Sequence, residues 1–207
     1  PPPPKTLFPY PTLFRSNIDL SSTGNDFGGT VDVAGNNATV TDANGLNLGT
    51  VDVDGNLNAT ANADGVSTGN LDLGTGTIGG ALVADSGNGD ITQEGNLSVS
   101  GDADLTAGTG NIDLGSTGND FTGTVDVAGN TATITDANGL NLGTVDVDGN
   151  LSATANADGV STGNLDLGTG TIGGGLVADS GNATITQEGN LSVSGDADLT
   201  AGTRSEE

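Results

Sequence analysis

Apolar and polar residues alternate one by one in short segments along most of this chain. The alternation places aliphatic side chains on one face and Asp, Asn, Ser or Thr on the other, which is the period of a half-buried β-strand. Turn signals such as Asn44-Gly45 and Asp54-Gly55 bound these segments. No segment shows helical periodicity, so the pattern predicts an all-β fold. The expected strands are residues 17–20, 30–33, 38–41, 46–48, 51–54, 71–73 and 97–100.

The strand pattern occurs twice, because residues 17–109 match residues 111–203 at an offset of 94 with only eight differences. Seven differences involve Gly, Ala or polar residues. The single exchange of large apolar residues, Val40 for Ile134, nearly keeps the side-chain volume, as a packed position requires. We therefore expect two consecutive repeats, residues 17–110 and residues 111–203.

A shorter period indicates which all-β fold the repeats adopt. A start of the form Gly/Ser-Asn-Ile/Leu recurs at Asn17, Asn56, Asn70, Asn96 and Asn111, which divides the 94 residues into five units that average about 18.8 residues. A turn of about nineteen residues suits one coil of a parallel β-helix, whose coils stack about 4.8 Å apart. The prediction is a β-helix of about ten coils, five in each repeat, with a length near 48 Å, or about ten spacings.

Two tandem β-sandwich domains are the alternative, since about 94 residues also suit one sandwich. A sandwich of this size normally packs around large side chains, whereas each repeat contains one aromatic residue, Phe27 or Phe121. A solenoid needs only a narrow column of aliphatic side chains, which favours the β-helix. In that fold we expect the two Phe residues to hold a loop against the stack of coils.

Asparagine is the residue type that we expect at the corners between strands. Its side chain tolerates a left-handed backbone, and its amide can stack on the amides of neighbouring coils as a ladder. The predicted corner residues are Asn17, Asn56, Asn70 and Asn96.

The two ends differ in composition from the repeats. Residues 1–16 hold all six Pro, the only Tyr and two of the three basic residues, and Arg204 is the third. Residues 6–16 read TLFPYPTLFRS and residues 204–207 read RSEE, and both resemble the translation of a sequencing-adapter sequence. We therefore expect residues 1–16 and 204–207 to be adapter-derived, with residues 1–16 disordered, and residues 17–203 to be an internal fragment of a longer reading frame.

Charge limits the partners of the repeats. Removing Glu206 and Glu207 from the 27 acidic residues leaves 25 in residues 17–203, which contain no Lys, Arg or His. Binding to phosphate requires basic side chains, so nucleic acid and an anionic membrane surface are excluded as partners. No apolar run is long enough to insert across a membrane.

Paired aspartates recur on the predicted strands at a spacing of two residues, which places both carboxylates of a pair on one face. Acid–base catalysis by such a pair needs a partner or a stabilising group, and the repeats offer no Lys, Arg, His or Tyr. We therefore predict a non-enzyme whose aspartates are solvated. The pairs are Asp52/Asp54, Asp102/Asp104, Asp146/Asp148 and Asp196/Asp198.

Calcium is the candidate ion for these aspartates, because calcium prefers hard oxygen ligands and these carboxylates lie near tight turns. The metal-site candidates are Asp52, Asp54, Asp146 and Asp148. Their spacing matches neither a twelve-residue calcium loop nor a nonapeptide repeat. Carboxylates stacked about 5 Å apart in water repel by only about 0.8 kcal/mol, so the fold requires no cofactor, and diffuse screening by cations suffices.

Thr-x-Thr pairs are the chemistry of ice-binding β-solenoids and form a remote alternative. An ice-binding array would repeat the pair on every coil, which this sequence does not do, so we interpret the pairs as ordinary outer-face residues of strands. They are Thr39/Thr41, Thr75/Thr77, Thr133/Thr135 and Thr169/Thr171.

Three segments carry a resemblance to a known family: GNDFGGTVDVAG (24–35), VTDANGLNLGTVDVDGNL (40–57) and GNLSVSGDADLTAGTGNIDL (95–114). They resemble the repeat region of filamentous-haemagglutinin-like exoproteins, as do their copies at 118–129, 134–151 and 189–203. The resemblance implies a right-handed parallel β-helix that forms the shaft of a large secreted or surface-attached bacterial adhesin. It also implies export through a partner outer-membrane barrel, and receptors on host cells, matrix or neighbouring cells that bind regions outside this segment. The second functional reading is a calcium-rigidified array of acidic extracellular β-sandwiches.

Overall fold

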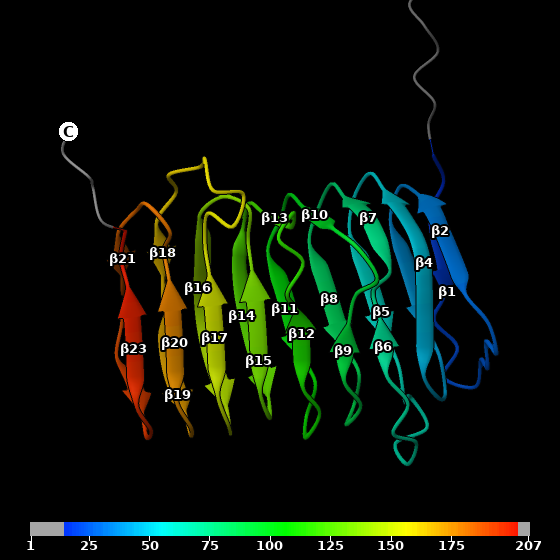
Figure 1. The fold of residues 1–207 in the computed structure, drawn as a ribbon. Helices are drawn as coiled ribbons and strands as arrows, with labels where there is room; N and C mark the ends of the chain where they lie inside the picture. Colours follow the sequence, from blue (N-terminus) through cyan, green and yellow to red (C-terminus); the bar gives the residue numbers. More distant parts are fainter. Residues whose placement is uncertain (1–14, 203–207) are drawn as a thin grey trace, which may run out of the picture.

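The computed structural model describes residues 15–202, which form one continuous stack of β-strand coils (Figure 1). This part of the chain contains 23 strands and no helix. Every strand pairing in it is parallel. The prediction of an all-β parallel solenoid is therefore confirmed, and the alternative of two β-sandwiches, which are antiparallel, is wrong. Apart from Arg15 and Ser16, the adapter-derived ends predicted at residues 1–16 and 204–207 lie outside the described residues.

The strands pair in three columns, which we call the first, second and third faces. The first face consists of β1 (Ile18–Leu20), β3 (Ala38–Thr41), β5 (Leu57–Thr60), β8 (Leu82–Asp85), β11 (Ala103–Thr106), β14 (Thr124–Gly129), the end of β16 (Leu140–Val147), β19 (Thr169–Ile172) and β22 (Leu191–Val193). The second face consists of the start of β4 (Leu46–Val53), β6 (Leu71–Asp72), β9 (Ile91–Thr92), β12 (Ile112–Leu114), β15 (Ala132–Thr135), β17 (Leu151–Thr154), β20 (Leu176–Asp179) and β23 (Ala197–Thr200). The third face consists of β2 (Val31–Gly35), the end of β4, β7 (Thr75–Ile78), β10 (Leu97–Val99) and β13 (Asp120–Phe121), followed by the start of β16, β18 (Leu165–Asp166) and β21 (Ile185–Thr186).

Equivalent strands of the two repeats lie on different faces. The first-face strands β1, β3, β5, β8 and β11 have their copies, β12, β15, β17, β20 and β23, on the second face. From β1 the chain makes four complete turns to β11, which is again on the first face. It then continues to β12 on the second face, a further third of a turn, so one repeat makes four and one third turns. The rotation is visible in Figure 1, where the loop before β6 projects at the bottom of the stack and its copy before β18 projects at the top.

The coil number corrects the sequence-based estimate. The chain makes about nine turns, not about ten, and about four and one third per repeat, not five. Residues 18, 38, 57, 82 and 103 are successive register partners, so four turns use 85 residues, or about 21 per turn. The estimate of nineteen was wrong because the Asn starts mark strands on different faces: Asn56 precedes β5 on the first face, and Asn96 precedes β10 on the third.

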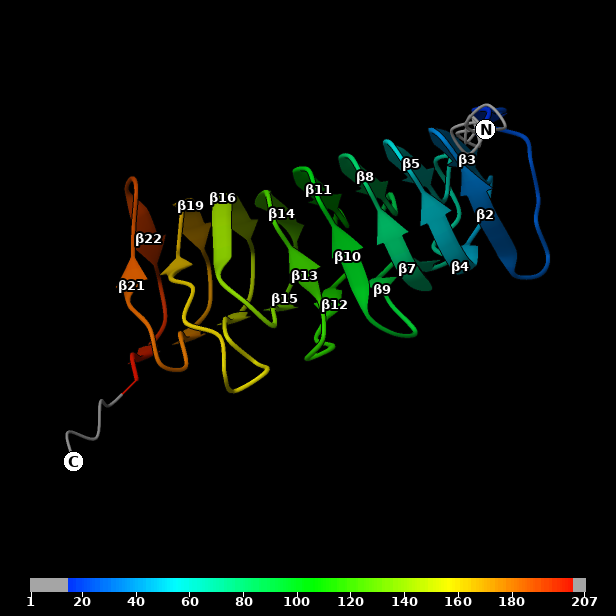
Figure 2. The same cartoon turned by 90° about the horizontal axis from the view of Figure 1, so that it is seen from above.

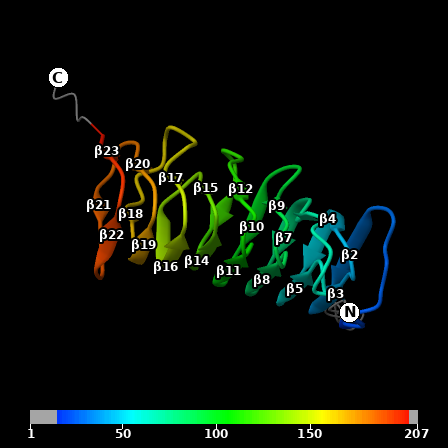
Figure 3. The same cartoon turned by 90° about the horizontal axis from the view of Figure 1, so that it is seen from below.

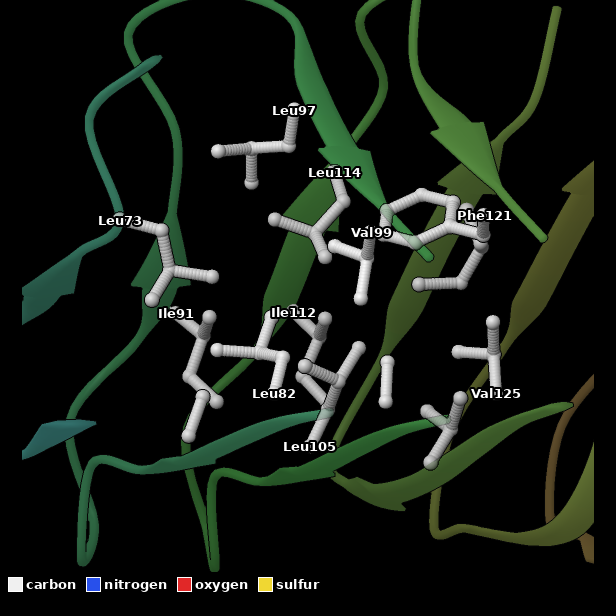
Figure 4. Close-up of a cluster of buried hydrophobic side chains, with 14 of the residues drawn as sticks. Leu73, Leu82, Ile91, Leu97, Val99, Leu105, Ile112, Leu114, Phe121 and Val125 are labelled. Carbon is white, nitrogen blue, oxygen red and sulfur yellow. The ribbon is translucent and has the colours of Figure 1, made fainter. Parts of the chain in front are cut away.

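The core is a column of aliphatic side chains that runs through the stack. Ile91, Leu82 and Leu97 point inward from the second, first and third faces, respectively, and all are at most 1% exposed (Figure 4). Burying one such side chain stabilises the fold by about 1.5–3 kcal/mol. Phe121 is the one aromatic residue buried within residues 15–202. Phe121 belongs to β13 and the core, so it does not hold a loop against the stack as predicted. Phe27 lies outside any strand and packs, partly buried, against the core, as predicted.

Asparagine side chains link neighbouring coils, but mostly by accepting backbone N–H groups and not by the predicted stacking of amide on amide. The Oδ1 of Asn37 accepts the N–H of Asn56 at 2.9 Å, and the Oδ1 of Asn56 accepts the N–H of Ala81 at 2.9 Å. The left-handed backbone lies elsewhere. Within residues 15–202, only Asn62 (φ 55°) and Asn156 (φ 56°) among non-glycine residues have positive φ. The predicted corner residues Asn17, Asn56, Asn70 and Asn96 directly precede strands, as corner residues should, but none of them uses the left-handed backbone that asparagine tolerates.

Candidate functional site

The candidate calcium residues of the first repeat lie on the outer surface around β4. Asp52 is engaged by Arg15, whose Nη2 lies 2.6 Å from Asp52 Oδ2 and whose Nη1 donates to the Asp52 carbonyl at 2.8 Å. The Arg15 Nε lies 3.7 Å from Asp54 Oδ2. The hydrogen bond from Arg15 lowers the pKa of Asp52. The positive group beside Asp52 and Asp54 is therefore the Arg15 guanidinium, in the place where a calcium ion was predicted.

The copies of these residues in the second repeat border an open hollow of about 180 Å³. Asp146 and Asp148 line it together with Thr106 and Ala128, and the Asp146 Oδ1 accepts the Thr171 hydroxyl at 3.0 Å. Within residues 15–202, no group of three or more His, Cys, Asp or Glu side chains could hold a common metal ion. An ion in this hollow would therefore depend on two carboxylates and on water for most of its ligands.

The pair Asp102/Asp104 has a structural use. The Asp102 Oδ1 accepts the backbone N–H of Thr124 at 2.9 Å, which joins the two repeats. Asp104 stacks on Asp126 in the neighbouring coil of the first face. Two stacked carboxylates in water repel weakly, and the strand ladder holds them in register.

The Thr-x-Thr pairs do not form a ladder. Thr77 is flanked in the register by Asp52 and Ser98, and Thr171 is flanked by Asp146 and Ser192. Thr41 is only 7% exposed. The flat Thr array that ice binding requires is therefore not formed by these strands.

A buried carboxylate was not predicted from the sequence. Asp136 is fully buried, and its oxygens accept the backbone N–H groups of Asn138 at 2.7 Å and Phe121 at 2.8 Å. Burial raises the pKa of Asp136 to about 6. Asp42, its copy, is buried and accepts two backbone N–H groups in the same way. The Asp-x-Asn-Gly motif signals a turn, but no sequence pattern shows that this turn faces the interior.

One open hollow of about 500 Å³ lies on the second face of the second repeat and is lined by residues on or next to β15, β17, β20 and β23. These strands lie side by side in Figure 1. Ser152 and Gly175 line it, where the first repeat has the larger Asn58 and Ala81. Val177, which is 52% exposed, is also part of its lining. Asp196 and Asp198, one of the predicted aspartate pairs, also line this open hollow.

The family comparison identifies repeats. The family model described as "Repeats of unknown function (DUF5649)" matches residues 35–68, 61–128, 129–162 and 156–205, which together cover most of the chain. Comparisons with curated proteins and with solved structures found no match. Within residues 15–202, no helix is long and apolar enough to cross a membrane.

Proposed function

This chain belongs to the DUF5649 repeat family, and we propose that it serves as a rigid, non-catalytic shaft or spacer segment of a large secreted or surface-attached bacterial adhesin. The observation that carries the proposal is the unbroken parallel stacking of about nine coils. At about 4.8 Å per coil, the segment spans roughly 43 Å along its axis. In this role the segment separates a binding region from its point of attachment.

Stiffness supports the proposal. Backbone ladders join adjacent coils without a break along the first and second faces, and a ladder in two parts, β2 to β13 and β16 to β21, runs along the third. All buried side-chain polar atoms in the described residues have hydrogen-bond partners. A stack in which each coil contacts only its neighbours transmits force along its axis without a hinge, provided that no interface between coils is weak. The interface between the two repeats is continuous, because β11 pairs with β14 over four residues.

The surface supports an extracellular role with no cofactor. The 25 acidic residues of residues 17–203 repel neighbouring shafts and polyanions. We propose that receptors on host cells, matrix or neighbouring cells bind other regions of the protein, and that export uses an outer-membrane barrel. These assignments come from the resemblance to filamentous-haemagglutinin-like exoproteins.

The spacer role is tested by measuring how far the repeats hold a binding module from the cell surface. One, two or three copies of the 94-residue repeat are placed between a surface anchor and a fluorescent binding module, and the height of the module above the cell surface is measured. Each copy should add about 21 Å, which is four and one third coils at about 4.8 Å, with a narrow distribution. A Gly/Ser segment of equal length is the control and should give a broad distribution. Heights that fail to increase linearly with copy number would refute the proposal.

Calcium is assigned no role in this proposal. Low-angle scattering by the dilute chain should be the same in calcium and in chelator, since the fold needs no bridging ion. A profile that loosens in chelator would favour a calcium-rigidified shaft with Asp146 and Asp148 as the first residues to substitute.

A further inference from the structure

Arg15 shows how an Asp-x-Asp pair of the repeats binds a guanidinium. Its Nη2 donates to Asp52 Oδ2 at 2.6 Å, its Nη1 donates to the Asp52 carbonyl oxygen at 2.8 Å, and its Nε lies 3.7 Å from Asp54 Oδ2. Each nitrogen of the planar group therefore faces a different oxygen. Three acceptors in this arrangement suit the fork of a guanidinium better than the single point charge of an ammonium.

The second repeat contains the same acceptors, because Asp146 and Asp148 are the copies of that pair. Both pairs belong to identical stretches of sequence, residues 41–57 and 135–151. In each pair the N–H of the second aspartate donates to a glycine carbonyl oxygen of the preceding coil at 3.0 Å. Figures 2 and 3 show that β4, which carries the first pair, lies beside β2 and β7, and that β16, which carries the second, lies between β14 and β19. Both pairs are therefore inside the stack and have the same backbone setting.

The two repeats differ in the residue at the corner that faces the pair. Arg15 lies at the position that Thr109 has in the second repeat, at the offset of 94 residues. The backbone contact is the same at both positions, because the carbonyl oxygen of the next residue, Ser16 or Gly110, accepts an N–H of the following coil at 3.0 or 2.8 Å, respectively. A long basic side chain in the first repeat is thus replaced in the second by a short, exposed one.

This exchange leaves the second pair beside open space. The hollow of about 180 Å³ is lined by both Asp146 and Asp148, and Gly108, the neighbour of Thr109, also lines it. The Thr171 hydroxyl donates to Asp146 Oδ1 at 3.0 Å, which helps to fix that carboxylate. Residues 17–203 contain no Lys, Arg or His, so a positive group for this site has to come from outside the repeats.

We propose that the Asp146/Asp148 pair binds an arginine side chain of a partner protein, and that Arg15 stands in for this arginine at the copy of the site. Charge favours a basic partner, because the chain carries a net charge of −24. The bound state of the copy also has the expected electrostatic effect, since the hydrogen bond from Arg15 lowers the pKa of Asp52. The site adds a contact along the shaft and does not depend on the spacer role.

Repetition makes such a site useful although each contact is weak. One exposed ion pair contributes little to affinity. The pair recurs after four and one third coils, so the two sites are about 21 Å apart along the axis and one face apart around it. A partner with arginines at this spacing can contact both sites at once, and linking the contacts multiplies their affinities.

The test is an NMR titration of the isotope-labelled full chain with N-acetyl-arginine amide. N-acetyl-lysine amide at the same concentration and ionic strength is the control. The arginine amide should shift the backbone N–H signals of Asp146 and Asp148 in a saturable way, with roughly millimolar or weaker affinity. The lysine amide should shift them several-fold less, because an ammonium cannot match three separate acceptors. The absence of a saturable shift, or equal shifts with the two amides, would overturn the proposal.

Exchanging the corner residues tests the assignment of the site. Thr109→Arg gives the second repeat the side chain that Arg15 provides in the first, and should abolish the shift at Asp146. Thr109→Gln, which is long but uncharged, should keep that shift. Arg15→Thr should open the copy of the site, so that the signal of Asp52 also shifts and the chain binds two arginine amides. Unchanged binding in Thr109→Arg, or no second site in Arg15→Thr, would show that the pair does not bind arginine in this way.

Discussion

Leu105→Ala and Leu199→Ala remove the same side chain from equivalent positions of the two repeats. Leu105 is 0% exposed between Ala84 of β8 and Val127 of β14, whereas Leu199 is 54% exposed on the last coil. Local strand sequence is identical at both positions. Any difference in stability between the variants therefore reports the stacking of coils.

The expected difference follows from burial. Replacing Leu by Ala removes three carbon groups, each worth about 0.8 kcal/mol when buried, and the cavity left in a stack that cannot collapse adds to this. Leu105→Ala should lower the free energy of unfolding by about 3–4 kcal/mol. Leu199→Ala loses about half of the transfer energy and leaves no cavity, so it should cost about 1 kcal/mol.

Urea unfolding followed by far-ultraviolet circular dichroism measures both values. The protein should be dilute, so that both variants unfold as monomers. Equal denaturant slopes for the two variants would show that the same unit unfolds. If the two substitutions cost the same, the buried column does not stabilise the stack as described.

Three further predictions follow from backbone geometry and buried polar groups. Gly76→Ala should lower the free energy of unfolding by about 3 kcal/mol, because Gly76 has φ of +144° and an added Cβ would collide with the Val51 carbonyl oxygen. Gly65→Ala is the control and should cost about 1 kcal/mol, because Gly65 also has a positive φ, +74°, but open space around it. Equal shifts of the melting temperature for the two variants would contradict this prediction. Asn62→Ala removes the Nδ2 bonds to two backbone carbonyls, at 2.6 and 2.7 Å, and should cost about 3 kcal/mol in urea unfolding; an unchanged midpoint would show that these bonds add nothing. Burial raises the pKa of Asp136 to about 6, above its value of 3.8 when unfolded, so protonation of Asp136 favours the fold. The free energy of unfolding should therefore rise by roughly 1 kcal/mol as the pH falls from about 7.5 to about 5, and Asp136→Asn should remove that rise.

Strand positions were predictable from alternation because a strand's period is local. The expected strand 38–41 is β3 as observed, and the expected strands 46–48 and 51–54 are the two arms of β4, which bends around a corner. Coil length was not predictable. It varies from 19 residues between Ala38 and Leu57 to 25 between Leu57 and Leu82, because the loop before β6 is inserted into one coil. The second repeat is rotated by one face because the lengths of the coils in the first repeat add up to four and one third turns.

The candidate site was predicted less well than the fold, for a physical reason. Alternation places Asp52 correctly on the outer face, but the contact with Arg15 joins residues 37 positions apart that only the stack brings together. The hydrogen bonds of the buried Asp42 and Asp136 carboxylates are also long-range. They accept the backbone N–H groups of Phe27 and Phe121, respectively, each 15 residues earlier in the chain. Long-range contacts of this kind leave no local periodicity.

The most direct test of a continuous, stiff shaft is a distance between spin labels at Asp19→Cys and Thr169→Cys. The register runs along the first face from Asp19 through Thr39, Asn58, Val83 and Asp104 to Asp126. It then crosses a bulge, where the neighbouring Val127 pairs with Val145, and continues from Thr144 to Thr169, which makes seven steps from coil to coil. Seven spacings of about 4.8 Å predict one narrow peak near 34 Å, extended by the length of the labels. A broad or bimodal distribution would contradict the continuous solenoid and, with it, the proposed role as a rigid spacer.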